Sequence, residues 1–265
     1  MRTRDGDSGG IERMRYIGRL ISPFVIRVGI AVFVELVAIV VLNLLQVTDL
    51  TSYATVIGVI GAVVTISVLY GMFDKGQKEA IWKRQGPMWK YWGILVMSVA
   101  ATVAVNTILL LTPIAEYSES YQETAALLYS PSLVMQIISV GIIYPILEEC
   151  MFRGLLYQRL QEKMTRKIAW ILSAILFGLY HGNLVQFIYA TIMGCMLVYL
   201  YETYGTLKAP IAAHICMNLT SVLFTQYNLF GWVYESVVRT VMVTILSVIL
   251  VCVSGMWIQK NCKKS

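Results

Sequence analysis

Two adjacent carboxylates and an arginine, Glu148, Glu149 and Arg153, lie near the end of a long apolar stretch. A charge inside a membrane costs on the order of 2.5–3.5 kcal/mol even on lenient scales, so such residues need a partner or a function. Glu149 and Arg153 are four residues apart, share a helix face and can pair. Glu148 lies roughly 100° away around the helix. It is left as a free carboxylate and a candidate general base. The alternative is a charged patch where the helix meets water.

The chain contains two histidines, His181 and His214, and both lie in apolar stretches. His214 shares a helix face with Asn218, four residues further on. Counted at about 1.5 Å per residue from the basic end of each predicted helix, Glu149, His181 and His214 lie roughly 9–16 Å deep. Three helices therefore bring polar side chains to a similar level, in the half of the membrane nearer that end.

The elements that must position these residues are membrane helices. Only 14% of the 265 residues are charged and the mean hydropathy is +0.70, whereas a soluble domain carries roughly 25% charged residues. Apolar runs close to the roughly 20 residues that span a bilayer recur along the chain. We expect an all-α polytopic membrane helix bundle of about eight transmembrane helices. The predicted spans are Val28–Val47, Thr51–Met72, Trp92–Leu111, Ser132–Arg153, Ile168–Tyr180, Leu184–Tyr201, Ala209–Phe224 and Val237–Ile258.

The basic residues indicate the orientation of these spans. With eight spans, 20 of the 21 Lys and Arg residues fall on one side of the membrane, which the positive-inside rule makes the cytoplasmic side. Both termini are then cytoplasmic. We expect a basic N-terminal segment at 1–27, one transmembrane domain at 28–258 with the candidate site within 132–224, and a basic tail at 259–265. The net charge of +6 is explained by topology, and no solvated domain is left to bind nucleic acid.

Other polar features have structural interpretations. The five cysteines have no CxxC spacing, and we expect them to be free thiols rather than disulfides or zinc ligands. Glu35 lies inside the first predicted span, where one hydrogen bond within the bundle would satisfy it. Residues 113–130 are acidic and rich in tyrosine, as an outer interfacial loop or short helix would be.

Taken together, the motifs resemble a known family. Glu-Glu-x-x-x-Arg, Phe-x-x-x-His and His-x-x-x-Asn on successive membrane helices are similar to the CAAX prenyl endopeptidase and abortive-infection family (CPBP) of intramembrane proteases. The resemblance extends to Phe152, Gly154 and Asn183. It covers about a third of the chain and says nothing about the first three spans.

The resemblance implies a role for each motif residue. Glu148 is the catalytic glutamate, and Glu149 and Arg153 are its supporting pair. The remaining site residues are His181, His214 and Asn218.

Two mechanisms use these residues. In one, Glu148 takes a proton from water while His181 holds that water, and His214 and Asn218 stabilise the oxyanion. In the other, Glu148, His181 and His214 are ligands of a zinc ion that activates the water. The family is often labelled a metalloprotease, but the glutamate scheme needs no metal, and we favour it slightly.

The expected function is an intramembrane endopeptidase that cuts a peptide or protein near the cytoplasmic side of the bilayer. The substrate could be lipid-modified or membrane-associated. Such a short chain fits a multi-pass protein of a bacterial plasma membrane. The alternatives are a non-catalytic membrane scaffold or bacteriocin self-immunity protein on the same fold, and a transporter. Transport is disfavoured because no inverted repeat is visible.

Overall fold

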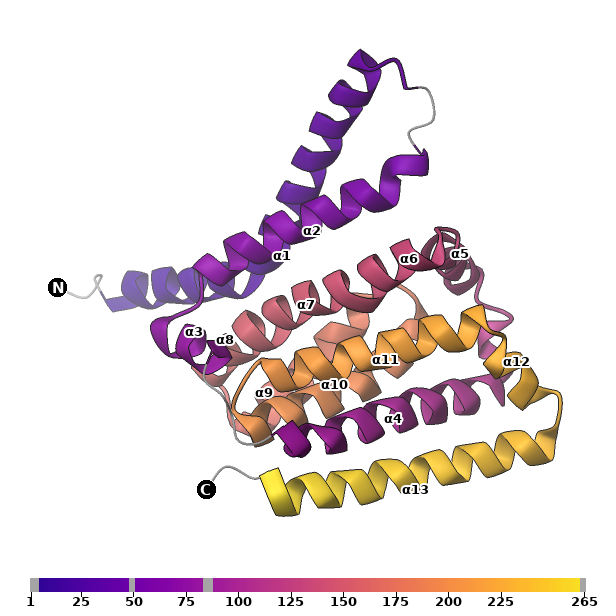
Figure 1. The fold of residues 1–265 in the computed structure, drawn as a ribbon. Coiled ribbons are helices and arrows are strands. Elements are labelled where there is room, and N and C mark those ends of the chain that lie inside the picture. The colour runs from indigo at the N-terminus through magenta and orange to yellow at the C-terminus, as the bar shows by residue number, and fades with distance from the viewer. Residues whose placement is uncertain (1–4, 48–50, 83–87, 263–265) are drawn as a thin grey trace.

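The computed structural model describes residues 5–47, 51–82 and 88–262, and within these ranges every regular element is a helix (Figure 1). The long single helices are α1 (Asp5–Leu44), α2 (Ala54–Gly71), α4 (Trp92–Leu110), α10 (Leu184–Tyr204), α11 (Lys208–Gln226) and α13 (Val237–Cys262). The shorter ones are η1 (Thr51–Tyr53), α3 (Lys75–Trp82), η2 (Met88–Tyr91), η3 (Pro113–Ala115), α5 (Glu119–Tyr129), α9 (Arg166–Leu179) and α12 (Leu229–Tyr234). The prediction of an all-α membrane bundle is confirmed.

The helix that carries both glutamates is continuous from Leu133 to Gln161. It consists of α6 (Leu133–Gln136), η4 (Ile137–Ile143), α7 (Tyr144–Glu149), η5 (Cys150–Tyr157) and α8 (Gln158–Gln161). Both η4 and η5 are π-helical. π-Helical turns are rare in proteins, and those that exist are often found at functional sites. Glu148 and Glu149 are the last two residues of α7, directly before the second π-helical segment.

Six helices of the described chain are long and apolar enough to cross a membrane, namely α1, α2, α4, the helix Leu133–Gln161, α10 and α13. The other two predicted spans correspond to α9 and α11. α9 has only 14 residues, and α11 carries the polar side chains His214 and Asn218. Both contact helices that meet the criteria, α9 against α10 and α11 against α4. The count of eight crossings, with both termini cytoplasmic, stays a prediction.

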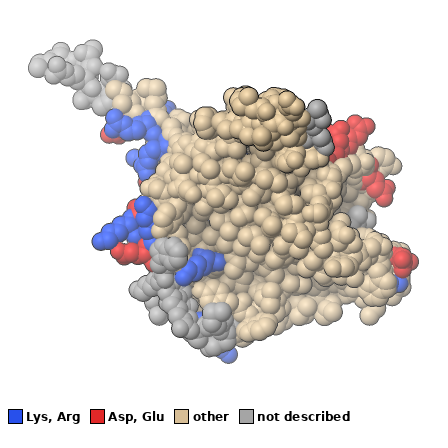
Figure 2. Space-filling view, turned by 45° about the horizontal axis from the view of Figure 1, so that its top comes forward, with Lys and Arg blue, Asp and Glu red and all other residues tan. Residues whose placement is uncertain are grey.

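Charge is distributed unevenly between the two ends of the bundle. The first described residues of α1 and the last residues of α13 lie at the same end (Figure 1). The Lys and Arg side chains visible in Figure 2 gather at that end, whereas Asp and Glu predominate at the opposite one. The acidic end carries Glu119 and Glu123 of α5. Asp49, also predicted on that side, lies outside the described residues.

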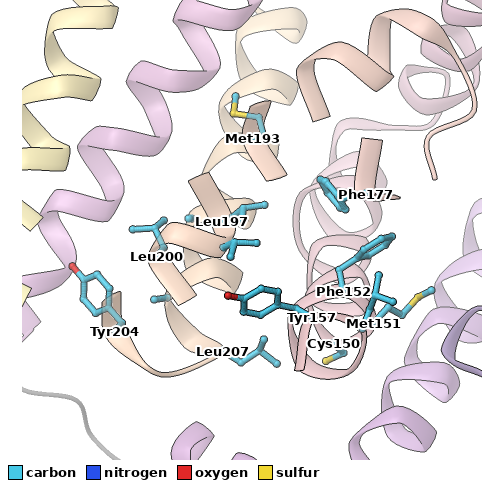
Figure 3. Close-up of a cluster of buried hydrophobic side chains, with 14 of the residues drawn as sticks. Cys150, Met151, Phe152, Tyr157, Phe177, Met193, Leu197, Leu200, Tyr204 and Leu207 are labelled. Carbon is cyan, nitrogen blue, oxygen red and sulfur yellow. The ribbon is translucent and has the colours of Figure 1, made fainter. Parts of the chain in front are cut away.

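The bundle core surrounds the second π-helical segment. All eight residues of Cys150–Tyr157 are buried, and in Figure 3 Tyr157 extends from this segment towards α10, which carries Leu197 and Leu200. α9 and α10 approach closely because glycines leave room between them. A Cβ atom at Gly194 would lie 3.2 Å from Ala174 Cα, and one at Gly178 would lie 2.7 Å from the Phe187 carbonyl oxygen. Such small residues are typical of helix contacts inside membranes.

α1 is the least buried of the long helices. Figure 1 shows its second half standing apart from the other helices, and apolar side chains such as Phe33 and Leu44 are exposed on it. An exposed apolar helix of this length suits contact with lipid. Glu35 is exposed on α1 and has no hydrogen bond or ion pair to another described residue, so the predicted bond within the bundle is not present.

The five cysteines, Cys150, Cys195, Cys216, Cys252 and Cys262, are all free.

Candidate active site

Glu149 and Arg153 form the ion pair that their spacing predicts. Arg153 Nη1 donates to Glu149 Oε1 at 2.8 Å, and both side chains are completely buried. Arg153 Nη2 also donates to the Gly194 carbonyl oxygen at 3.1 Å, and its guanidinium lies 4.4 Å from the centre of the Phe177 ring. The arginine thereby links the glutamate helix to α9 and α10. Buried charges persist only with such partners.

His214 contacts both glutamates. Its Nδ1 lies 2.9 Å from Glu149 Oε1 and its Nε2 lies 3.8 Å from Glu148 Oε2. A carboxylate that is ion-paired with Arg153 can only accept hydrogen bonds, so the donor in this contact is His214 Nδ1–H. This fixes the imidazole ring and turns Nε2 towards Glu148. With Arg153 and His214 on the same oxygen, Glu149 is engaged in the structure, and Glu148, 16% exposed, is the accessible carboxylate.

His181 follows the C-terminal end of α9, and its ring is also fixed. Its Nδ1 lies 2.8 Å from the Phe177 carbonyl oxygen, which can only accept, so Nδ1 is the donor and a neutral ring keeps its lone pair on Nε2. The Phe177 ring stands edge-on to both histidine rings, with centroids 5.0 Å and 5.7 Å apart. Phe177 therefore spaces the two histidines.

Asn218 lies on α11, one turn beyond His214. Its Nδ2 donates to the Val140 carbonyl oxygen at 2.8 Å, and Val140 belongs to the first π-helical segment. One amide hydrogen of Asn218 therefore bonds α11 to the glutamate helix. The second amide hydrogen and the amide oxygen take no part in this bond.

One cavity of about 290 Å³ joins these groups. Glu148, His181, His214 and Asn218 all line it. Glu149 and Arg153 do not line it: Arg153 bonds Glu149, and Glu149 in turn bonds His214. Four of the six predicted site residues therefore share the cavity, and the other two support it. Their roles in catalysis remain a proposal.

The predicted zinc ligands do not form a metal-binding group. Glu148 and His214 approach each other to 3.8 Å, but in the described part of the chain no three His, Cys, Asp or Glu side chains are placed to hold a metal ion together. The donor set of Glu148, His181 and His214 does not fit a three-ligand site as it stands. The chemistry that these residues support without a metal ion uses side chains alone.

The sequence did not reveal the far wall of the cavity. This wall is α5, which contributes Tyr121, Thr124, Leu128 and Tyr129. These residues are half-buried while the rest of α5 is mainly exposed. Their separations of three, seven and eight residues follow one face of a helix, a signal that was present in residues 113–130. It was not recognised because the segment is short and acidic.

Comparison with known proteins agrees with the motifs. Residues 130–220 match the family model of type II CAAX prenyl endopeptidase Rce1-like proteins, a range that contains all six predicted site residues. The chain is also 30% identical over 148 residues to "Putative membrane peptidase YdiL" of Bacillus subtilis (strain 168). That alignment covers 56% of this chain and 59% of the relative, so the similarity spans less than two thirds of the relative's length. No solved structure matches the chain. The ordered motifs, the family model and the similarity to this relative together support a membrane protease of the CPBP type, related to the CAAX prenyl endopeptidases.

Proposed function

We propose that this multi-pass membrane protein is an endopeptidase in which Glu148 activates water for attack on a peptide bond. The observation that carries the proposal is the shared cavity, in which an accessible carboxylate meets two histidines and an amide. Hydrolysis needs a base for the water and donors for the developing oxyanion. These four side chains supply both.

Each step has a residue suited to it. A water held by the His181 Nε2 lone pair gives a proton to Glu148 as its oxygen bonds to the peptide carbonyl carbon. The carbonyl oxygen becomes an oxyanion, which accepts hydrogen bonds from His214 Nε2–H and the free Asn218 amide hydrogen. The C–N bond then breaks, and Glu148 returns the proton to the leaving amine. The products are a carboxylic acid and an amine, and the glutamate is regenerated.

The charges of the site are compatible with this scheme. Glu149 and Arg153 form one buried ion pair. The scheme requires a protonated His214, which then pairs with Glu148, 3.8 Å away. The four side chains then carry no net charge, which suits a site inside a membrane. An imidazolium has a hydrogen on both nitrogens, so His214 can donate to Glu149 and to the oxyanion together.

The substrate that this chemistry requires is a peptide or protein that reaches the membrane interior. A membrane-associated or lipid-modified protein meets this requirement, and a bacterial plasma membrane is the proposed location. The competing function is a non-catalytic scaffold or self-immunity protein of the same family, which would bind a partner without cleaving it.

Cleavage by the purified protein distinguishes these functions. Detergent-solubilised protein is incubated with a library of quenched fluorescent peptides, alongside Glu148→Gln and the control Glu79→Gln, which changes an exposed glutamate. We expect the wild type and the control to cleave at equal rates and Glu148→Gln to be slower by on the order of 100-fold to 10,000-fold. Cleavage that survives in Glu148→Gln excludes Glu148 as the base, and no cleavage by the wild type favours the scaffold.

A further inference from the structure

The cavity lies in the half of the bundle nearer α5. α4 and α11 run towards that end (Figure 1), and each lines the cavity only with residues from its middle and C-terminal half, as far as Asn106 and Ser221. α10 starts from that side and contributes residues of its first half, beginning with Gln186. The hollow therefore runs from Glu148 towards the acidic end of the bundle and away from the basic end.

The short helix α9 explains why there is space at this end. Its 14 residues extend about 21 Å at 1.5 Å per residue, against about 30 Å for the hydrocarbon core. The chain turns back at His181 before it reaches the acidic side of the bilayer. α5 lies over the part of the bilayer that α9 does not cross, and it contacts α10. It presents Tyr121 and Thr124 to the cavity and leaves Glu119 and Glu123 exposed.

The lining of the cavity mixes polar and apolar side chains and is almost without charge. Glu148 is the one Asp, Glu, Lys or Arg among the described residues that line it. Burial raises the pKa of both Tyr121 and Tyr129 above the ordinary value, so these phenols remain hydrogen-bond donors at neutral pH. Together with Asn106 and Gln186 they suit neutral amide groups. In the proposed scheme the cation of the cavity, His214, is already paired with Glu148, so a free peptide carboxylate would add an uncompensated negative charge.

We propose that the substrate enters this cavity from the acidic, non-cytoplasmic end beneath α5, and that it is bound as an uncharged internal peptide segment rather than by a free C-terminus. This proposal rests on the proposed function for its chemistry. It differs from the sequence-based expectation of cleavage near the cytoplasmic side. That expectation measured depth from the basic end alone and could not show which way the cavity extends.

Access can be tested without measuring catalysis. Ser221→Cys places a thiol inside the cavity, and a membrane-impermeant maleimide is added to intact cells or to inverted vesicles, with the wild type as background for its own cysteines. We expect labelling of Ser221→Cys above the wild-type background in cells and none in inverted vesicles. Labelling above background only in inverted vesicles, or from neither side, overturns the proposed route.

A second experiment tests whether blocking the cavity beneath α5 lowers the rate of peptide cleavage. A bulky maleimide adduct is formed on purified Thr124→Cys, which lines the cavity, and on Ala126→Cys, which is exposed on the outer face of α5. We expect the adduct at position 124 to lower peptide cleavage at least tenfold and the adduct at position 126 to leave it unchanged. Equal rates for the two labelled proteins contradict entry beneath α5.

The second part of the proposal is tested with paired substrates. Peptides of one sequence are made with a C-terminal amide or a free acid three residues after the scissile bond. We expect the amide to be cleaved at least tenfold faster. Equal rates or a preference for the free acid overturn the internal-segment proposal. If the wild type cleaves neither, or Glu148→Gln still cleaves, the proposed function fails, while the labelling of Ser221→Cys still decides the side of access.

Discussion

The Glu149 carboxylate and the His214 imidazole are joined by a 2.9 Å contact between Oε1 and Nδ1, although 65 residues separate them in the chain. The same oxygen accepts from Arg153 at 2.8 Å. A carboxylate that holds one nitrogen of a histidine determines which way the other nitrogen points. Glu149 is thus a positioning residue for His214, and the adjacent Glu148 is left for chemistry.

Removal of the arginine should destabilise the protein. Arg153→Ala strands the buried Glu149 carboxylate, and breaking one side of a buried pair costs about 3–5 kcal/mol. The exposed pair of Lys75 and Glu79, 3.8 Å apart with side chains 92% and 68% exposed, is the control, and Lys75→Ala should cost less than about 1 kcal/mol. Denaturant titration in mixed micelles measures both. Equal small losses would show that the buried pair contributes no more than a surface pair.

A lysine at the same position should restore only part of the lost stability. Arg153 bonds Glu149 and the Gly194 carbonyl with two different nitrogens while it lies over the Phe177 ring. Lysine keeps the charge but lacks the planar fork that makes these contacts together. The free energy of unfolding of Arg153→Lys should fall between those of the wild type and Arg153→Ala. Full recovery would mean that charge alone is required here.

The two adjacent glutamates should respond differently to the same substitution. Glu149→Gln leaves the fully buried Arg153 without a counter-charge, so it should lower the free energy of unfolding by about 3–5 kcal/mol. Glu148→Gln changes a partly exposed side chain with a 3.8 Å neighbour, and its effect on unfolding should be far smaller. Thermal unfolding of the two variants side by side measures this. Similar midpoints would remove the distinction between a supporting and a free glutamate.

Local spacing predicted much of the fold and part of the site. Apolar runs near the thickness of a bilayer indicated the long helices, and the four-residue interval between Glu149 and Arg153 indicated their pair. Both follow from the rise and period of a helix, which are the same in any sequence. The grouping of Glu148, His181 and His214 was inferred because three polar side chains in hydrocarbon need one another or water.

Long-range contacts could not be predicted in the same way. The bond between Glu149 and His214 depends on how α11 lies against the glutamate helix, and no sequence period encodes that. The two π-helical segments escaped detection because no residue type or spacing identifies a π-helical turn. The exposure of Glu35 depends on where α1 stands, and the role of α5 depends on α9 ending early.

Close packing of α9 against α10 should make Gly178 intolerant of a side chain. A Cβ atom there would lie 2.7 Å from the Phe187 backbone oxygen, which cannot move without shifting α10. Gly178→Ala should cost about 1–3 kcal/mol, as overpacking of a core does. Gly29→Ala is the matched control, since nothing lies within 4 Å of a Cβ atom at that position of α1. Thermal midpoints should fall only for Gly178→Ala, and an equal fall in both would point to helix flexibility instead.

The orientation of the bundle can be checked at three exposed positions. Glu119 of α5 and Glu235 after α12 belong to the acidic end, and Lys163 lies between α8 and α9 at the basic end. Since basic residues stay in the cytoplasm, an impermeant thiol reagent added to intact cells should label Glu119→Cys and Glu235→Cys but not Lys163→Cys, relative to the wild type. Lys163→Cys should react only after the cells are opened. Labelling of Lys163→Cys alone would invert the orientation. Protection of Glu235→Cys with Glu119→Cys still labelled would mean that α9, α10 and α11 do not make an odd number of crossings, and the eight-span arrangement would be wrong.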